Sequence, residues 1–245
     1  MTSINRDNVV SLPDDFISVK DALVERLFKE VRSDNIFFDV ILAGRAGVGK
    51  SSTVNTLMDK KVTNVDRYKT GTTEIMTFQR EYGGIKFRFT DTPGLCDSMQ
   101  EERKDIQNLT ELKKRIAGSF CLLYITEIDS SRVASDEKRA IKMLTETLGK
   151  TVWNQSIIVF TGTDRTSSQD YESVLSKRSE LLKETIYAFS KINVEEQISV
   201  VSLSNNLKTL PNGQTWMPTL YEKILQALVV YPSIQKIRQN HLRKA

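Results

Sequence analysis

The sequence contains few of the residues that build disulfide frameworks, metal centres or membrane spans. Its two cysteines, Cys96 and Cys121, are too few for a disulfide framework, so we expect a reducing compartment. The single histidine, His241, excludes a metal site with several histidine ligands and leaves little basis for histidine acid–base catalysis. The longest apolar runs, such as residues 121–125, are far shorter than the roughly 18 residues of a spanning helix. The opening residues are too polar for a secretory signal. These features predict a soluble intracellular domain, or the soluble part of a longer protein.

A strong excess of charge of one sign is also lacking. The chain has 35 Lys and Arg residues against 31 Asp and Glu residues, which gives a net charge of +4. This is too mild to indicate nucleic-acid binding, and we expect no nucleic-acid partner. Hydrophobic residues make up 39% and charged residues 27% of the 245 residues, values that are typical of globular proteins and exclude a wholly disordered or fibrous chain.

The length is compatible with one large domain plus extensions. Residues 1–18 are polar and are interpreted as a flexible lead-in. The main domain is predicted over 19–230 and begins with a short amphipathic helix at 19–32, where apolar residues recur every four positions. A basic tail follows over 231–245.

From Phe37 onward, predicted strands alternate with predicted helices. The strands are expected at 37–43, 76–82, 85–90, 120–125, 156–160 and 198–201, and the helices at 50–58, 101–117, 135–148, 171–190 and 217–230. Gly83 and Gly84 indicate a hairpin between the second and third strands. Ser135 is expected to cap the helix predicted at 135–148. The pattern predicts an α/β fold with a mostly parallel six-stranded sheet, one antiparallel edge and helices on both faces.

The most specific motif is a glycine-rich phosphate loop, formed by Gly44, Arg45, Ala46, Gly47, Val48, Gly49, Lys50 and Ser51. It lies between a predicted strand and a predicted helix, as this motif requires. Its backbone N–H groups, with Ser52, are expected to surround phosphate oxygens at the positive end of the helix. Lys50 can reach the β- and γ-phosphates, and the Ser51 hydroxyl can bind Mg²⁺. The alternative is a glycine turn that binds nothing.

A second motif, Asp91-Thr-Pro-Gly94, ends the third predicted strand and is typical of the γ-phosphate sensor of GTPases. Asp91 can hold Mg²⁺ through water, and the N–H group of Gly94 can meet the γ-phosphate. A proline turn after a strand is the alternative. Between the two motifs, Thr73, or otherwise Thr72, is a candidate Mg²⁺ ligand in a switch loop.

Two further segments predict a pocket for guanine. Thr161-Gly-Thr-Asp164 stands where GTPases usually carry Asn/Thr-Lys-x-Asp. The carboxylate of Asp164 can accept hydrogen bonds from guanine N1 and N2, which adenine does not offer, so the pocket selects GTP. Gly162 replaces the lysine that normally covers the base, so packing over guanine is weaker or comes from elsewhere. After the next strand, a backbone N–H at Ser204-Asn205 would meet guanine O6.

These motifs together resemble the septin-related GTPases, which include the immunity-associated (GIMAP) proteins and the Toc receptors of the chloroplast outer envelope. The Toc resemblance is closer and covers about residues 19–230, including the segments 124–129, 171–180 and the specific Leu-Pro-Asn-Gly-x-x-Trp at 210–216. Gly162 and Ser204 depart from the Toc pattern, which has histidine and glutamate there, and Asp164 is more similar to the immunity-associated proteins.

The resemblance implies a P-loop GTPase that uses GTP/GDP and Mg²⁺. It also implies a homodimer through the nucleotide face, because the Toc arginine that matches Arg132 reaches into the partner's nucleotide site. Leu95 follows the sensor, where fast GTPases often carry a glutamine that orients water. We therefore expect a switch whose monomer hydrolyses GTP slowly, with Lys50 and Arg132 as the catalytic candidates. The alternatives are a GTP-locked assembly scaffold with negligible hydrolysis and an ATP-using P-loop enzyme, against which Asp164 argues.

The C-terminal residues 234–244 combine basic side chains with apolar residues three or four positions apart. This pattern is typical either of a solvated terminal helix or of a helix that lies on an anionic membrane. The expected location is cytoplasmic, and at an organelle membrane surface if the tail binds lipid.

Overall fold

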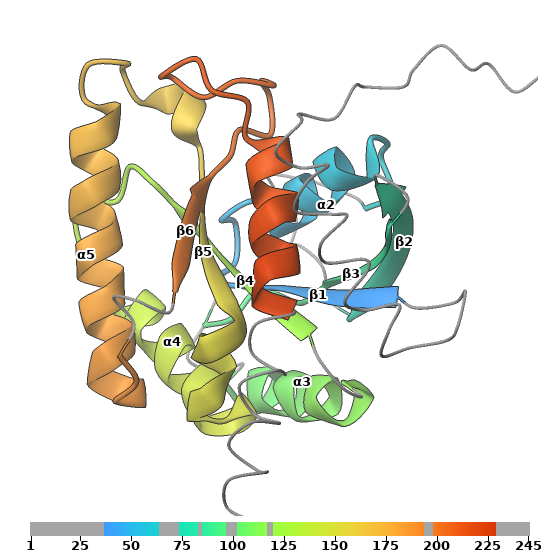
Figure 1. The fold of residues 1–245 in the computed structure, drawn as a ribbon. Coiled ribbons are helices and arrows are strands. Elements are labelled where there is room, and N and C mark those ends of the chain that lie inside the picture. The colour runs from blue at the N-terminus through green and yellow to red at the C-terminus, as the bar shows by residue number, and fades with distance from the viewer. Residues whose placement is uncertain are drawn as a thin grey trace, which may run out of the picture. The chain divides into compact units, whose positions relative to one another are not determined.

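The described part of the chain is a six-stranded sheet with helices on both faces (Figure 1). The structure is a computed structural model that describes residues 37–63, 74–82, 85–96, 102–116, 120–193 and 198–228. All of them lie in one unit of the chain, Ile36–Ala245. The predicted helix at 19–32, the Gly83–Gly84 turn, Thr72, Thr73 and the basic tail lie outside the described residues.

The sheet has the strand order β2-β3-β1-β4-β5-β6. Its strands are β1 (Phe37–Ala43), β2 (Met76–Tyr82), β3 (Ile85–Asp91), β4 (Phe120–Glu127), β5 (Ser156–Thr161) and β6 (Ser199–Ser202). All neighbouring pairs are parallel except β2 and β3, which pair antiparallel from Tyr82 opposite Ile85 to Met76 opposite Asp91. This confirms the predicted fold class, with β2 as the one antiparallel edge strand.

One face of the sheet is covered by α3 (Glu102–Arg115), α4 (Ser135–Leu148) and α5 (Tyr171–Ser190). Alternate residues of a strand point to the same face. Ile41, Leu122 and Ile158 accordingly share one buried cluster with apolar residues of these three helices, such as Leu144 and Leu182. Each helix is amphipathic, so it buries its apolar side here and leaves its charged side in water.

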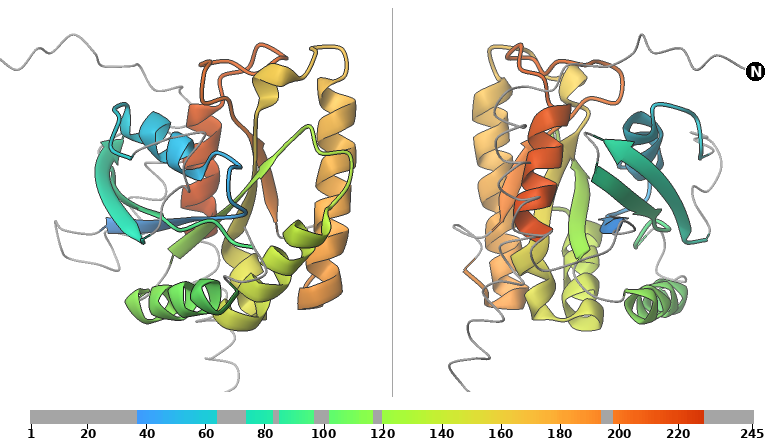
Figure 2. Two further views of the ribbon diagram at one scale, coloured as in Figure 1. Left: turned by 180° about the vertical axis from the view of Figure 1, so that it is seen from behind. Right: turned by 45° about the vertical axis from the view of Figure 1, so that its right-hand side comes forward.

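The opposite face is covered by α2 (Lys50–Met58) and by the helix at 217–228, the red helix of Figure 2. Tyr221 of that helix stacks on Tyr82 with ring centroids 3.9 Å apart and contacts Phe87 at 5.0 Å. Trp216, just before the helix, is 2% exposed. The ring of Tyr221 covers the β2–β3 side of the sheet, where a large aromatic side chain buries much apolar area.

Most predicted element boundaries agree with the structure within two residues. The third and fourth strands run slightly further than predicted, to Asp91 and Glu127. Asp91 is buried and bonded to Ser51, and Thr126, just before Glu127, is buried and bonded to Glu137. The predicted cap at Ser135 is wrong. Ser135 is already the first residue of α4, and the capping position is Ala134, which makes no side-chain cap hydrogen bond. The Asp136 carboxylate instead accepts the backbone N–H of Glu137 at 2.9 Å.

Candidate nucleotide-binding site

The predicted site residues gather at one edge of the sheet. The parallel strands β1, β3, β4, β5 and β6 all end there, and the loops that follow them carry the motifs identified in the sequence. β1 lies between β3 and β4, which come later in the chain; α2 follows β1 on one face of the sheet, and α3 connects β3 to β4 across the other face. Ligands of open α/β sheets bind at such a switch point, outside the carboxyl ends of the strands.

The phosphate loop connects β1 to α2 in the conformation that its glycines allow. Gly44 has φ +154°, and a Cβ on it would overlap the carbonyl oxygen of Ile125, so only glycine fits there. Gly49 has φ +97° and occupies the N-cap position of α2. Lys50 is 6% exposed, and its Nζ donates to the carbonyls of Gly44 at 3.1 Å and Arg45 at 2.6 Å. The lysine ammonium is therefore held inside the loop.

The sensor motif packs directly against the phosphate loop. The N–H of Leu95 donates to the carbonyl of Gly44 at 3.1 Å. A Cβ on Gly94 would lie 2.6 Å from the Cα of Ala46, so the two loops approach too closely for any side chain. Leu95 is 2% exposed and belongs to the core, where it contributes packing and no polar group.

Two predicted Mg²⁺ ligands are brought together. The Ser51 hydroxyl donates to the carboxylate of Asp91 at 2.7 Å, and Asp91 is fully buried. A hydroxyl and a carboxylate fit Mg²⁺, which takes oxygen ligands and usually completes its shell with water and substrate phosphates. Among the described residues, no cluster of three or more His, Cys, Asp or Glu side chains is placed to hold a metal ion. Thr73 lies outside the described residues.

The two predicted base segments also meet. The Asp164 carboxylate is exposed and lies 3.4 Å from the Ser204 hydroxyl. Its other oxygen accepts the side-chain amide of Asn206 at 2.8 Å. The Ser204 hydroxyl accepts the N–H groups of Asn206 and Leu207, which fixes the turn after β6. Asn206 was not predicted as a site residue, although it directly follows Asn205 in the motif.

Thr161 and Asn205 brace the site with their side chains. The Thr161 hydroxyl lies 2.7 Å from the carbonyl of Val48 and thereby joins the end of β5 to the phosphate loop. The Asn205 amide bonds with Thr53 at 3.3 Å and Thr56 at 3.2 Å, so it points at α2. The predicted contact of a backbone N–H at Ser204-Asn205 with guanine O6 stays a prediction.

Gly162 stands where GTPases usually carry a lysine, and the structure shows which side chain lies beside it. A Cβ on Gly162 would overlap the guanidinium of Arg165. Arg165 Nη2 donates to Glu127 at 2.9 Å, and Arg165 Nε lies 3.4 Å from Asp129. The hydrogen bond with Glu127 is the main cause that raises the pKa of Arg165. No sequence pattern identified Arg165, because its position is defined only by the short helix η3 (Thr163–Arg165).

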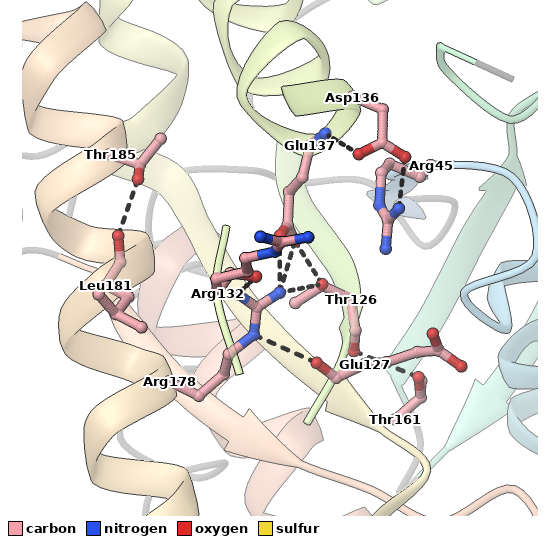
Figure 3. Close-up of polar contacts among 10 residues, drawn as sticks. All are labelled: Arg45, Thr126, Glu127, Arg132, Asp136, Glu137, Thr161, Arg178, Leu181 and Thr185. Atoms are coloured by element: carbon pink, nitrogen blue, oxygen red, sulfur yellow. Dashed lines mark hydrogen bonds and ion pairs between the residues drawn. The ribbon is translucent and has the colours of Figure 1, made fainter. Parts of the chain in front are cut away.

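Arg132 lies between β4 and α4, and its side chain is exposed. Within the described parts of the chain, its guanidinium makes no hydrogen bond or ion pair. Its backbone carbonyl accepts a hydrogen bond from Arg178 at 3.2 Å. Arg178 and Glu137 form a buried ion pair that sequence analysis missed (Figure 3). Arg45 of the phosphate loop pairs with Asp136 at 2.5 Å.

The two cysteines are free thiols, and both are buried. Burial raises the pKa of both thiols, which keeps them protonated and unreactive. In the part of the chain that the structure describes, we find no helix whose length and hydropathy would let it cross a membrane.

Comparison with known proteins gives consistent matches. The model of the AIG1 family matches residues 38–206. Translocase of chloroplast 33 from Arabidopsis thaliana is 31% identical over 224 residues, which cover 84% of this chain and 74% of that protein. Among longer relatives, translocase of chloroplast 120 from the same plant is 27% identical, and the match covers only 18% of its length.

Crystal structures of Arabidopsis thaliana Toc33 share the fold. A dimerisation-deficient mutant superposes with a TM-score of 0.74 at 27% identity, over 89% of this chain and 94% of that chain. The complex with GDP and Mg²⁺ gives a TM-score of 0.73 at 29% identity, over 89% and 93%. A third structure gives a TM-score of 0.71 at 29% identity, over 93% of this chain and 97% of that chain. It concerns the translocon components atToc33 and psToc159, and dimerisation is described as important for their GTPase activity.

Proposed function

This chain belongs to the AIG1 family, and we propose on that premise that it is a GTP-binding switch that hydrolyses GTP slowly with Mg²⁺ and is regulated by nucleotide-dependent homodimerisation. The observation that carries the proposal is the convergence of three motifs at one sheet edge. The phosphate loop, the Ser51–Asp91 pair and the Asp164–Ser204 pair come from the ends of four different strands and lie at the same edge of the sheet.

Each group of residues has a defined task in the proposed reaction. The backbone N–H groups of the phosphate loop and Lys50 hold the β- and γ-phosphates and stabilise the charge that develops on them. Ser51 and Asp91 hold Mg²⁺, which neutralises phosphate charge when it is bound. Asp164 selects guanine, because its carboxylate accepts from the two guanine donors N1 and N2.

We propose slow turnover because of Leu95, the residue that follows the sensor motif. Leu95 is buried and apolar, so it positions no water for attack on the γ-phosphate. We propose that Arg132 acts in trans in a homodimer, where an exposed guanidinium can bind phosphate oxygens in a bidentate manner. The dimerisation described for Toc33 and its relatives supports this proposal.

Leu95 also favours a second candidate function, a GTP-locked assembly scaffold with negligible hydrolysis. Analytical ultracentrifugation with GDP, GMPPNP and GDP plus aluminium fluoride, together with hydrolysis assays over a wide protein concentration range, tests both. The switch requires nucleotide-dependent dimers and a specific activity that rises with concentration. Dimers without measurable hydrolysis support the scaffold. Displacement of a fluorescent GTP analogue by ATP at equal concentration would contradict both.

The location proposed for the chain is cytoplasmic, at the surface of an organelle membrane that the basic residues 231–245 contact. The relatives named for chloroplasts support an organelle surface. Co-sedimentation with vesicles that contain anionic lipid tests this: the chain should pellet with them at low salt and stay in solution when residues 231–245 are removed.

A further inference from the structure

A buried ion pair connects α4 to α5. The side chains of Arg178 and Glu137 are 2% and 1% exposed. Arg178 Nη2 donates to both carboxylate oxygens of Glu137, at 2.8 and 2.7 Å, and the Thr126 hydroxyl donates to the same carboxylate at 2.5 Å. A buried ion pair is a poor source of stability, because desolvation of both charges offsets their attraction. The other hydrogen bonds of Arg178 therefore indicate better than stability does what this ion pair contributes.

The same guanidinium holds the segment that carries Arg132 at two points. Arg178 Nε donates to the carbonyl of Glu127, the last residue of β4, at 3.3 Å. Arg178 Nη1 donates to the carbonyl of Arg132 at 3.2 Å. These two carbonyls bracket the loop between β4 and α4, and Figure 3 shows the guanidinium between them. Arg178 thus fixes the backbone of Arg132 without approaching the surface.

The start of α4 is also tied to the phosphate loop. Asp136, the neighbour of Glu137, pairs with Arg45 at 2.5 Å, and its other oxygen accepts the backbone N–H of Glu137. The neighbours Asp136 and Glu137 therefore bind two arginines. Asp136 binds Arg45 of the phosphate loop, and Glu137 binds Arg178, which holds the loop that carries Arg132. The carbonyl of Arg132 is held relative to both the sheet and the phosphate loop (Figure 3).

We propose that Arg178, oriented by Glu137, is the positioning residue that holds Arg132 in place for its contact across the dimer. The inference rests on the proposed function, in which Arg132 acts in trans. An arginine that binds phosphate in a bidentate manner depends on a fixed backbone, because a shift of its Cα carries the guanidinium away from the phosphate oxygens, and small misplacements of positioned groups are costly. The affinity of the nucleotide-dependent dimer then depends on a side chain that is buried away from the dimer surface.

The test is a double-mutant cycle that removes the pair without leaving a buried charge. The variant Glu137→Leu/Arg178→Met replaces both partners with apolar groups of similar size. It is combined with Arg132→Ala, and the dimer dissociation constant is measured by sedimentation with GDP plus aluminium fluoride. We expect the pair variant to weaken the dimer about tenfold and to add nothing in the Arg132→Ala background, as coupled sites behave. Nucleotide affinity of the monomer should stay within about twofold of wild type.

A second readout is independent of the dimer. Amide hydrogen exchange of residues 128–134 in the monomer should accelerate in the pair variant and in Arg178→Lys, which keeps the charge but loses the planar fork. Ile186→Ala is the matched control, because it removes a fully buried side chain of the same helix about two helical turns away from Arg178. If the pair variant does not fold, Glu137→Gln and Arg178→Lys carry the test.

Three results would overturn the inference: an unchanged dimer in the pair variant, effects that multiply with those of Arg132→Ala, or the same loss of dimer affinity in Ile186→Ala. A different result separates the proposed function from this inference. If Arg132→Ala alone leaves the dimer intact, the trans role of Arg132 fails. If Arg132→Ala weakens the dimer and the pair variant does not, only the positioning role of Arg178 fails.

Discussion

Lys50 is the residue through which the phosphate loop can be tested most directly. Its ammonium is held by the carbonyls of Gly44 and Arg45, at the centre of the loop. Lys50→Ala should lower GTP affinity by about 1.5–3 kcal/mol or more, the value of a charge-assisted hydrogen bond, without unfolding the protein. Isothermal calorimetry measures the affinity, and Lys60→Ala, an exposed lysine after the same helix, is the control. Unchanged GTP affinity in Lys50→Ala would refute the phosphate-loop assignment.

Asp164 tests the choice of base. Asp164→Asn should move the preference from GTP toward xanthosine triphosphate, because xanthine carries an oxygen where guanine carries its exocyclic amine. An unpaired buried donor or acceptor costs about 1–3 kcal/mol, which corresponds to roughly tenfold to a hundredfold in affinity. Competition against a fluorescent GTP analogue measures the shift, with the exposed Asp170→Asn as the control. If Asp164→Asn binds GTP as wild type does, other residues read the base.

For single residues, sequence patterns predict local motifs but not contacts between distant segments. Local motifs placed Lys50, Ser51 and Asp91 at one edge of the sheet, where the structure has them, because their positions follow from the strands and the helix that flank them. Their roles toward phosphate and Mg²⁺ stay predictions. Arg178 and Glu137 are 41 positions apart on two different helices, and each is an ordinary charged residue in its own segment. Only the packing of α4 against α5 brings them together, so no local pattern predicts that they are buried.

At the scale of elements, periodicity was sufficient for most helices and strands. The helices α2, α4 and α5 begin and end where their apolar spacing predicts. The errors occur at polar residues near element ends. Thr126 belongs to β4 because its hydroxyl is bonded in the interior, and Ser135 lies inside α4 instead of capping it. Sequence patterns assign polar residues near element ends to loops. In the structure, some of these residues belong to strands and helices because hydrogen bonds to distant parts of the chain hold them there.

The first turn of α4 should carry an acid-sensitive contact. Burial alone would raise the pKa of the Asp136 carboxyl, but the hydrogen bond and charge of Arg45 outweigh it and lower this pKa below its usual value of 3.8. A lowered pKa stabilises the folded state above the pKa of the unfolded chain, about 3.9, and the stabilisation is lost as pH falls through the folded value.

Asp136→Asn should therefore lower the free energy of unfolding at pH 7 by less than about 1 kcal/mol, because the pair is partly exposed. The difference from wild type should shrink toward pH 3. Urea unfolding at both pH values measures it, and Glu180→Gln on the exposed side of α5 is the control. A difference between wild type and Asp136→Asn that is equal at both pH values would show that the Arg45 pair does not depend on ionisation of Asp136.

At the scale of the whole molecule, Arg132 tests the dimer. Arg132→Ala should weaken the nucleotide-dependent homodimer more than it weakens nucleotide binding by the monomer. A two-fold dimer would bury this loop twice, once on each protomer. A true arginine finger contributes about 10³–10⁵ to the rate. We expect about tenfold or less here, because the buried Leu95 orients no water beside it.

Sedimentation and hydrolysis of wild type and Arg132→Ala over a wide concentration range check this prediction. Lys138→Ala, an exposed change on α4, serves as the control for surface charge. A wild type that stays monomeric with every nucleotide, or an Arg132→Ala variant that dimerises equally well, would remove Arg132 from the site. A slow switch that acts as a monomer would then remain.

The central place of β1 has a consequence for how the protein is made. β1 pairs with β3 on one side and with β4 on the other, and both of these strands are synthesised after it. At about 5–20 residues per second, seconds pass before the ribosome has released Glu127 and both edges of β1 can be covered. During that time an apolar strand, Val40-Ile-Leu-Ala43, has two open edges, the condition in which strands pair with the wrong chain. The placement that centres the phosphate loop in the sheet therefore leaves this apolar segment of the nascent chain without its partner strands until β4 has been synthesised.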